Sequence, residues 1–361
     1  MSRTGINLEM ISAKSGSFLA AMLIKYLHGG MRMKRNSMQL LAAFLMGVVM
    51  PALAMQIGQA VVITDQQPAQ SQTVPSDTTA TQQLQQTPAI IPVLLGESTL
   101  RMMELDEYLL GVVLAEMPVD FEEEALKAQS IAARTCALQC TQEGSKHPGG
   151  AVCGDSKCCQ AYIEPAEYLR DGGFQENVDK VQRAISDTAG QILTYQGELI
   201  QATYFSCSGG RTEDAVAVWG TDVPYLVSVD SPGEEHADIY SNTVQFSALE
   251  FAALLGRNLR GNCADWLGNV TYTRGGGVAT MVIAGKSYTG TELREKLDLY
   301  STAFSMRAEG SSITVTTTGK GHRVGMSQYG ADAMAKNGCM YKEILAHYYP
   351  GTRIDKVDML R

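Results

Sequence analysis

Hydrophobic residues follow two spacings along this 361-residue chain, and each spacing predicts a different kind of element. Residues 110–138 hold an apolar run, a break at Met117-Pro118, and a second run in which small and apolar residues recur every three to four positions. That spacing is typical of helices with one buried face, so the stretch predicts two helices joined at a proline turn. Asp120 and Glu123 have the spacing of a capping box at the start of the second helix.

Other segments continue this mixture along the chain. Short runs rich in β-branched and aromatic residues predict strands at residues 90–95, 98–102, 191–195, 199–205, 278–283 and 312–317. Helical spacing recurs at residues 176–187, 248–255, 326–336 and 341–349. The chain shows no internal repeat. The sequence therefore predicts an α+β fold, a single compact domain with a lobed insertion.

An apolar run near the N-terminus predicts export of everything that follows it. Residues 38–54 are mostly apolar and come after Met33-Lys34-Arg35, whose positive charges predict that this end stays in the cytoplasm. The A-x-A-like site at residues 52–54 fits a cleaved signal peptide. Alternatively, the run stays uncleaved as a membrane anchor, although about 17 residues is at the short limit for a span. Both alternatives remain open.

Local composition indicates a linker between the apolar run and the folded domain. Residues 66–87 are Gln, Thr, Ser and Pro with almost nothing apolar, which predicts a disordered stalk. The predicted order is a cytoplasmic N-terminus with a mis-started extension (1–37), a membrane anchor or signal segment (38–55), a disordered linker (56–89) and the folded domain (90–361).

The net charge of −9 is unevenly distributed. Residues 1–64 carry six Lys or Arg and Glu9 as their one acidic residue, which leaves about −14 on the remainder. A general nucleic-acid-binding protein has a basic face across its folded region, so the composition excludes that class of partner. An anionic ligand must therefore meet a local cationic patch.

Glu116 stands at the break between the first two predicted helices. The negative end of the helix dipole and burial among Val112, Val113, Leu114 and Met117 should both raise its pKa. A raised pKa favours the protonated form that donates a proton to a leaving group near neutral pH. The alternative is a charged helix terminus with no further role.

Cysteine and histidine residues gather in a short Gly-rich loop. His147, Cys153, Cys158 and Cys159 are spaced H-x5-C-x4-C-C, and their side chains can close tetrahedrally around Zn²⁺. Four filled positions leave no site for water, so such a metal would be structural. The alternative is one or two disulfides, with Cys140 as a further partner, because an exported chain permits them.

A strand-like run ends in the segment Tyr204–Gly210 (YFSCSGG). Its hydroxyls, small residues and paired glycines let a ligand approach the backbone closely. It lacks the GxSxG pattern of a nucleophilic serine. The alternative is a strand running into a glycine turn.

A second Gly-rich segment is Gly319–Gly330 (GKGHRVGMSQYG). Lys320, His322 and Arg323 bring cationic and imidazole groups that suit a carboxylate or sugar hydroxyls. The spacing excludes a Walker-type phosphate loop. The alternative is a tight loop that opens a helix at Ser327.

These segments, in this order, resemble the SpoIID/LytB domain family. The likeness spans residues 90–353, and the N-terminal anchor and stalk fit the same family. The residues that carry it are Glu116-Met117-Pro118, the run from Glu124 to Thr135, Tyr204-Phe205, Ser208-Gly209-Gly210, Val218-Trp219-Gly220, Pro224-Tyr225-Leu226, Gly321-His322 and the run from Val324 to Gly330.

The resemblance implies a lytic transglycosylase that acts on peptidoglycan during spore engulfment. Such an enzyme cleaves the β-1,4 bond after N-acetylmuramic acid in strands stripped of stem peptides and leaves 1,6-anhydro ends. The family's catalytic glutamate lies in its E-M-P motif, which matches Glu116. The implied partners are peptidoglycan strands, a SpoIIP-like cell-wall amidase and a membrane scaffold protein. The implied location is the outer side of the sporulation septum or engulfing membrane, or outside the cell if the signal is cleaved.

A second function is open, because LytB-type relatives are described as amidase enhancers. The chain would then bind and stimulate a cell-wall amidase without cleaving glycan. Neither function needs an organic cofactor.

The resemblance also bears on the Cys/His loop. Clostridial members carry two histidines and two cysteines there, and His147, Cys153 and Cys159 match while Cys158 replaces the second histidine. A thiolate ligates zinc as imidazole does, so structural zinc is expected. A Cys158–Cys159 or Cys153–Cys158 disulfide remains the oxidised alternative. Arg323 is a further departure, at a position where the family often has glycine.

One carboxylate is sufficient for the implied reaction. An ordinary glycosidase needs two carboxyl groups. Here the nucleophile is the C6 hydroxyl of the same sugar ring, and such tethering supplies an effective molarity of roughly 10⁵ M or more. Substrate contacts are expected from sugar-binding and carboxylate-binding side chains, namely Arg134, Tyr204, Ser206, Ser208, Gly209, Gly210, Lys320, His322 and Gln328.

Overall fold

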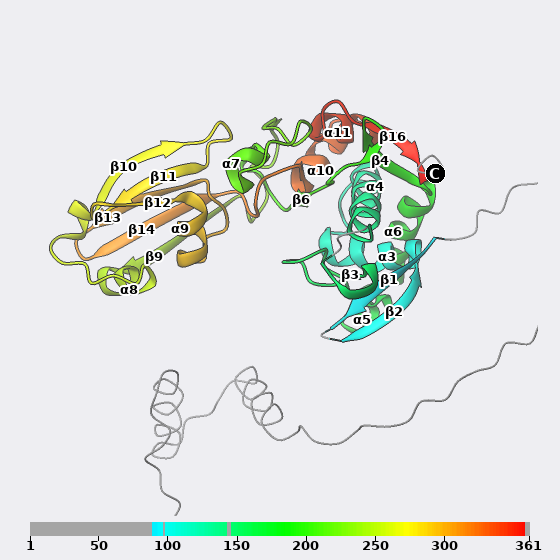
Figure 1. The fold of residues 1–361 in the computed structure, drawn as a ribbon, viewed down its shortest axis with the longest axis horizontal. Coiled ribbons are helices and arrows are strands. Elements are labelled where there is room, and N and C mark those ends of the chain that lie inside the picture. The colour runs from blue at the N-terminus through cyan, green and yellow to red at the C-terminus, as the bar shows by residue number, and fades with distance from the viewer. Residues whose placement is uncertain (1–88, 97, 143–145, 358–361) are drawn as a thin grey trace, which may run out of the picture. The chain divides into compact units, whose positions relative to one another are not determined.

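The computed structural model describes residues 89–96, 98–142 and 146–357. The predicted N-terminal segment, the anchor or signal segment and nearly all of the linker lie outside these residues. Within the described part of the chain, no helix is both long and apolar enough to cross a membrane. The predicted mixture of helices and strands is confirmed (Figure 1).

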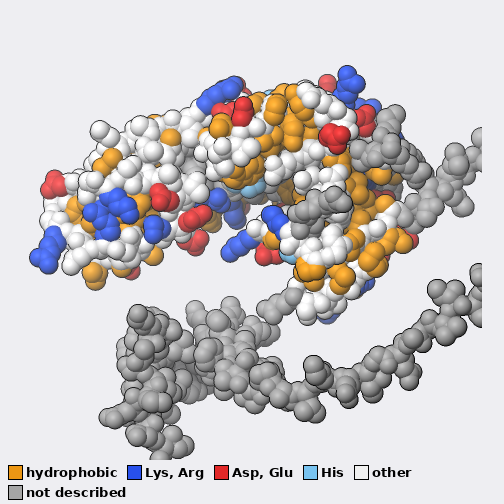
Figure 2. Space-filling model, viewed as in Figure 1, with side chains coloured by type: hydrophobic (Ala, Val, Ile, Leu, Met, Phe, Trp, Pro, Cys, Tyr) orange, Lys and Arg blue, Asp and Glu red, His pale blue; other side chains and the backbone are white. Residues whose placement is uncertain are grey.

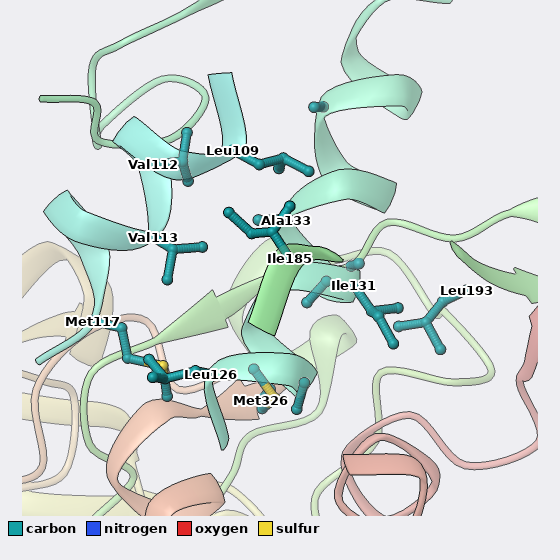
Figure 3. Close-up of a cluster of buried hydrophobic side chains, with 14 of the residues drawn as sticks. Leu109, Val112, Val113, Met117, Leu126, Ile131, Ala133, Ile185, Leu193 and Met326 are labelled. Atoms are coloured by element: carbon teal, nitrogen blue, oxygen red, sulfur yellow. The ribbon is translucent and has the colours of Figure 1, made fainter. Parts of the chain in front are cut away.

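Two hydrophobic cores organise the described residues. Helix α4 (Glu123–Cys140) lies in the first core (Figure 1). It packs against α3 (Leu105–Glu116), α6 (Gln175–Asp187), α10 (Gln328–Lys336), α11 (Tyr341–Tyr348) and β4 (Gln191–Tyr195). Its small buried residues, such as Ala125, Ala128 and Ala132, let neighbouring elements approach its backbone closely. Figure 3 shows α3 and α4 side chains, including Val113 and Ile131, meeting Ile185 and Leu193 in this core.

The first core is built from two separate parts of the chain. The part before the second core comprises β1 (Ile90–Leu95), β2 (Thr99–Glu104), α3 (Leu105–Glu116), α4, the 3₁₀ helix η1 (Pro148–Gly150), β3 (Val152–Cys153), α5 (Pro165–Arg170), α6 (Gln175–Asp187), β4 (Gln191–Tyr195), β5 (Glu198–Leu199), β6 (Tyr204–Phe205), β7 (Gly210–Arg211), α7 (Ala215–Trp219) and β8 (Asp230–Ser231). The part after it comprises β15 (Met326–Ser327), α10 (Gln328–Lys336), α11 (Tyr341–Tyr348) and β16 (Arg353–Lys356).

Sheet pairing brings these two parts together. Strand β16 pairs antiparallel with β4, in the order β16-β4-β5, while β1 lies between β2 and β3. Strand β15 pairs in parallel with β6, which sets Met326 beside Tyr204 and Ser327 beside Phe205. The two Gly-rich segments singled out in the sequence therefore meet at this strand pair.

The second core is formed by one continuous stretch, and its buried members all lie between Phe251 and Val315. Strand β9 pairs antiparallel with β14, and Ser241 faces Thr318, so the stretch begins and ends at the same place. On the face drawn in Figure 2, basic and acidic side chains lie among one another over these strands. Its elements are β9 (Ser241–Ser247), α8 (Ala248–Leu254), the 3₁₀ helix η2 (Cys263–Trp266), β10 (Leu267–Tyr272), β11 (Val278–Ile283), β12 (Lys286–Thr289), α9 (Gly290–Leu297), β13 (Phe304–Glu309) and β14 (Ser312–Thr318).

Several predicted boundaries match the structure and others do not. The strands predicted at 90–95, 191–195 and 278–283 match β1, β4 and β11. Residues 199–205 are not one strand, because only the ends of this run pair, as β5 and β6. The helix predicted from Met326 begins at Gln328 instead, since Met326 and Ser327 pair with β6.

The predicted capping box at the start of α4 is wrong. Helix α4 begins at Glu123, and Glu122 precedes it without a side-chain cap. The Glu122 backbone N–H instead donates to Asp332 Oδ1 of α10 at 2.8 Å. A tertiary contact with a helix more than 200 residues away thus satisfies the N–H of the residue that precedes α4, whereas the sequence pattern assigned the Glu123 N–H to the Asp120 side chain.

Candidate functional site

Helix α3 ends at Glu116, which lies at the proline break. The backbone of Met117 is extended (φ −123°, ψ 134°), as expected for a residue before Pro118. Val112 and Val113 are fully buried and fix this end of the helix in the first core, whereas Glu116 is half-buried. A rigid element thus holds one carboxyl group at the edge of the core.

Burial and two neighbours set the ionisation of Glu116. Burial raises the pKa of Glu116, in the direction that the sequence predicts. The Ala161 backbone N–H donates to Glu116 Oε1 at 2.5 Å, and the Gln328 side chain lies against the carboxyl group. Both contacts lower the pKa and offset burial only in part. The raised pKa favours the protonated form that a general acid requires.

Tyr204 borders Glu116 from strand β6. Burial, and then the nearby Glu116 carboxylate, raises the pKa of Tyr204 well above its usual value, so the hydroxyl stays neutral. This hydroxyl donates to Gln160 Oε1 at 2.8 Å, and the Gln160 amide nitrogen donates to the Tyr108 hydroxyl at 3.3 Å. Within the described residues, no second carboxylate is among the groups that shift the pKa of Glu116.

Gln328 is the first residue of α10 and follows the β15 strand that pairs with β6. Its side chain is 4% exposed. Although it lies against Glu116, its amide nitrogen does not reach hydrogen-bond geometry with any group of the described residues. Buried donors normally find a partner. Gln328 therefore offers a donor for a water or a ligand beside the carboxyl group.

The side chain of Glu234, a residue that no sequence motif marks, accepts hydrogen bonds from the YFSCSGG segment. It is 1% exposed, and its Oε2 accepts from Ser208 Oγ at 2.7 Å and from the Gly209 N–H at 2.8 Å. Its Oε1 accepts from Ser231 Oγ at 2.7 Å and Ser327 Oγ at 2.5 Å. A buried carboxyl group whose two oxygens accept from this many donors is fixed in place within the protein, which suits a structural role.

Three residues of the YFSCSGG segment, Phe205, Cys207 and Ser208, are buried. Ser208 is fully buried against Glu234, and the Gly210 N–H donates to Ser208 Oγ at 3.0 Å. Ser206 differs, because it is half-buried and its hydroxyl has no hydrogen-bond partner among the described residues. Gly209 and Gly210 thus form the predicted turn, with positive φ at both residues. The Ser206 hydroxyl remains available to a ligand.

Arg134 of α4 is 1% exposed, and its guanidinium reaches the C-terminal end of α6. Its guanidinium donates to the backbone oxygens of Thr188 at 2.9 Å and Ile185 at 3.2 Å. It also pairs with Asp106 at 3.3 Å. A cation at this end of a helix satisfies free carbonyls and opposes the helix dipole. The structure therefore gives Arg134 partners within the protein.

His322 and Lys320, both expected to bind substrate, lie in different surroundings. The His322 ring packs between Phe205 and Trp219, with centroid separations of 5.5 and 5.4 Å. Trp219 is 41% exposed, so His322 supports an aromatic face that is open to solvent. Lys320 is exposed, and its ammonium lies 5.0 Å from the centre of the Tyr300 ring.

His322 gives the fold a pH dependence that can be measured. Burial, and then Arg294, lowers the pKa of His322 from 6.5 to about 4. Between these values the unfolded chain binds the extra proton, so stability should fall as pH drops from about 6.5 towards 4, by at most about 1.4 kcal/mol per pH unit. His322→Gln should flatten this part of the stability curve in thermal melts. His236→Gln, at an exposed position, is the control and should leave the curve unchanged.

The Cys/His loop brings its four predicted ligands together. The donor atoms of His147, Cys153, Cys158 and Cys159 all lie within 4.8 Å of one another, and Cys158 Sγ lies 3.3 Å from His147 Nε2. Three sulfurs and one imidazole nitrogen at this spacing fit the donor set of a tetrahedral zinc site. Strand β3 carries Cys153, and its parallel pairing with β1 fixes one side of the cluster.

The structure does not show the disulfide alternative. All eight cysteines lie in the described residues, and all are free thiols. Cys140, the further partner in that alternative, is the half-buried last residue of α4.

Comparisons with known proteins place the chain in a family. A family model described as Stage II sporulation protein matches residues 96–195, a range that includes Glu116 and the Cys/His loop. Stage II sporulation protein D of Bacillus subtilis (strain 168) is 42% identical over 281 residues, covering 76% of this chain and 81% of the relative. The protein of the same name from Bacillus amyloliquefaciens is 41% identical over the same shares.

A relative with a different name also aligns. The protein called Amidase enhancer from Bacillus subtilis (strain 168) is 29% identical over 302 residues, covering 68% of this chain and 40% of the relative. The higher identity and fuller coverage belong to the sporulation proteins. The chain belongs to the stage II sporulation protein D family.

Proposed function

We propose that this chain is a peptidoglycan lytic transglycosylase in which Glu116 is both the acid and the base. The observation that carries the proposal is one half-buried carboxyl group with a raised pKa, surrounded by the neutral side chains of Tyr204 and Gln328. A site with a single carboxyl group suits a reaction whose nucleophile belongs to the substrate.

The reaction follows from that arrangement. Protonated Glu116 gives its proton to the β-1,4 glycosidic oxygen, and the bond from this oxygen to C1 of N-acetylmuramic acid breaks. The C6 hydroxyl oxygen of the same ring bonds to C1, and its proton passes to the Glu116 carboxylate. The products are a 1,6-anhydro end and a free 4-hydroxyl, and Glu116 is again protonated. No water is consumed.

The proposed glycan contacts use side-chain polar groups that have no hydrogen-bond partner within the described residues. Gln328 Nε2 and the Ser206 hydroxyl are available to bind sugar hydroxyls or N-acetyl groups. The Tyr204 side chain borders Glu116. Exposed Lys320 is the candidate for the lactyl carboxylate, and Trp219 offers an aromatic face. His322 packs against Trp219, and Ser208 shares the Glu234 carboxyl group with Ser327, the residue before Gln328, whereas Arg134 contacts none of these groups.

We further propose that the Cys/His cluster holds structural Zn²⁺. His147, Cys153, Cys158 and Cys159 would fill all four tetrahedral positions, so the metal would hold the loop and supply no bound water.

Chelation is therefore expected to lower thermal stability. Zinc at about 1,000 times its Kd stabilises the folded state by about 4 kcal/mol, which corresponds to roughly 8–16 °C in Tm for a domain of this size. Elemental analysis beside thermal melts measures both effects. Cys158→Ser should lose the metal, whereas Cys339→Ser, outside the cluster, should keep it. An unchanged Tm after complete chelation would argue against a structural metal.

A second candidate function rests on the relative named Amidase enhancer. In that case the chain would stimulate a cell-wall amidase, and Glu116 would be dispensable. Purified wild type and Glu116→Gln, each assayed with denuded glycan strands and with a partner amidase on intact peptidoglycan, separate the two. Loss of glycan cleavage in the variant supports the transglycosylase. No cleavage by wild type, with equal amidase stimulation by both proteins, supports the enhancer.

A further inference from the structure

The segment Cys159–Ile163, which we call the strap, lies along helix α3. The Ile163 N–H donates to the Gly111 backbone oxygen at 3.2 Å. A Cβ on Gly111 would come within 2.3 Å of the Tyr162 ring and 2.5 Å of the Ile163 oxygen, so only glycine admits this approach. The Tyr162 ring also stacks on Tyr108 of the same helix, with centroids 5.7 Å apart and planes 5° from parallel.

The middle of the strap contacts the groups around Glu116. Ala161 donates its N–H to Glu116 Oε1, and Gln160 joins the Tyr108 and Tyr204 hydroxyls. Since Oε1 accepts this N–H, the proton of the acid form belongs on Oε2. The strap therefore determines which carboxyl oxygen delivers the proton.

The beginning of the strap belongs to the Cys/His cluster. Cys159 is the last donor of that cluster and is directly followed by Gln160. The N–H groups of Cys158 and Cys159 both donate to the Asp155 oxygen at 2.9 Å, which closes a turn at this end. The strap is thus fixed by the cluster at one end and by Gly111 at the other, with the Ala161 contact between them.

We infer that the strap is a positioning element through which the Cys/His cluster orients Glu116. The absence of a side chain at Gly111 lets the strap approach helix α3 closely enough to do so. This inference rests on the proposed transglycosylase for its effect on catalysis, but the physical link from cluster to carboxyl group does not depend on any activity. Metal at the cluster holds Ala161 in place, and Ala161 holds Oε1.

Amide hydrogen exchange, resolved to single residues, tests the link without an activity assay. In the zinc-loaded protein the Ala161 amide should exchange slowly. Glu116→Ala removes the acceptor and should speed exchange at Ala161 by about tenfold or more with the metal still bound. Chelation should speed exchange at Ala161 and Ile163, while amides inside α6, such as Val181, remain protected. Slow exchange at Ala161 after complete chelation would overturn the inference.

Gly111→Ala tests whether the close approach of the strap to helix α3 positions Glu116. This variant should bind one metal per chain, show fast exchange at Ala161, and lose about 10²-fold in kcat with KM little changed, because the carboxyl group is misplaced. Gly173→Ala is the control for a ring clash alone: its Cβ would come within 2.2 Å of the Tyr168 ring, with no backbone atom among its nearest neighbours. The control should keep both exchange and kcat.

The outcomes separate this inference from the proposed function. Wild-type exchange and kcat in Gly111→Ala would overturn the positioning role and leave the transglycosylase intact. Absence of anhydro products from wild type, with exchange at Ala161 still coupled to metal and to Glu116, would overturn the function and leave the link intact.

Discussion

Glu116→Gln is expected to reduce kcat for glycan cleavage by about 10²- to 10⁴-fold, the usual contribution of a positioned acid or base. Glutamine has the same shape, and its oxygen can still accept from the Ala161 N–H, which contacts Oε1 in the wild type. It cannot deliver a proton to the glycosidic oxygen. The variant should fold normally, because replacing a carboxylate whose burial is unfavourable with a neutral amide adds no desolvation cost.

The pH profile gives this prediction a direction. The acid must be protonated, so activity should fall as pH rises through the pKa of Glu116. Because burial raises that pKa, the fall should occur at higher pH than for an ordinary carboxyl group. Initial rates on denuded strands at a series of pH values measure the effect. Glu107→Gln, at an exposed position in the first turn of α3, is the control and should keep the profile. Equal rates for wild type and Glu116→Gln would remove Glu116 from the mechanism.

Arg323→Ala is expected to destabilise the protein by about 3–5 kcal/mol, the cost of leaving a buried charge without its partner. Arg323 and Glu213 have side chains 2% and 0% exposed and lie 3.1 Å apart. The Arg323 guanidinium also donates to the backbone oxygens of Ser208 at 2.6 Å and Gly275 at 2.7 Å. Since Gly275 lies between β10 and β11, one side chain ties the YFSCSGG segment to the second-core stretch.

The backbone of Arg323 allows a finer test. Its φ is +65°, the left-handed region that glycine adopts without strain. Arginine and alanine carry the same strain there, so Arg323→Ala isolates the ion pair. Arg323→Gly should be about 1 kcal/mol more stable than Arg323→Ala. Adding Glu213→Gln to Arg323→Ala should recover part of the loss, because it removes the unpaired charge.

Chemical denaturation measures these free energies of unfolding. Arg307→Ala is the matched control, because Arg307 and Glu309 form an exposed pair and such pairs contribute at most about 1 kcal/mol. A loss in Arg323→Ala no larger than in Arg307→Ala would show that the buried pair does not hold these segments together.

Local patterns in the sequence predicted the elements whose partners lie nearby. Strands β1, β4 and β11 and the helix break at Pro118 follow from short-range hydrophobic spacing. The start of α4 could not be predicted in this way, since Asp332 of a distant helix satisfies its first donor. Strand β9 was also missed, because its exposed and half-buried residues alternate without a strong apolar run.

For the candidate site, too, the sequence predicted residues with a local spacing pattern and missed contacts between distant residues. Glu116 and the Cys/His loop were identified from residue type and spacing, and the structure gathers the four loop residues. The partners of Glu234 and the Ala161 contact with Glu116 could not be found, because a buried carboxylate and a backbone N–H leave no spacing signal. Arg323 was noted as a departure from glycine, but its buried partner Glu213 appears only in the fold.

Mass spectrometry of the products that wild type releases from denuded glycan strands tests the central claim most directly. If Glu116 acts alone with the C6 hydroxyl as nucleophile, every new end should be a 1,6-anhydro end, about 18 Da lighter than a hydrolysed end, since no water is added. Incubation in ¹⁸O-labelled water should leave these ends unlabelled. Reducing ends that carry the label would contradict the account, because they require water as the nucleophile.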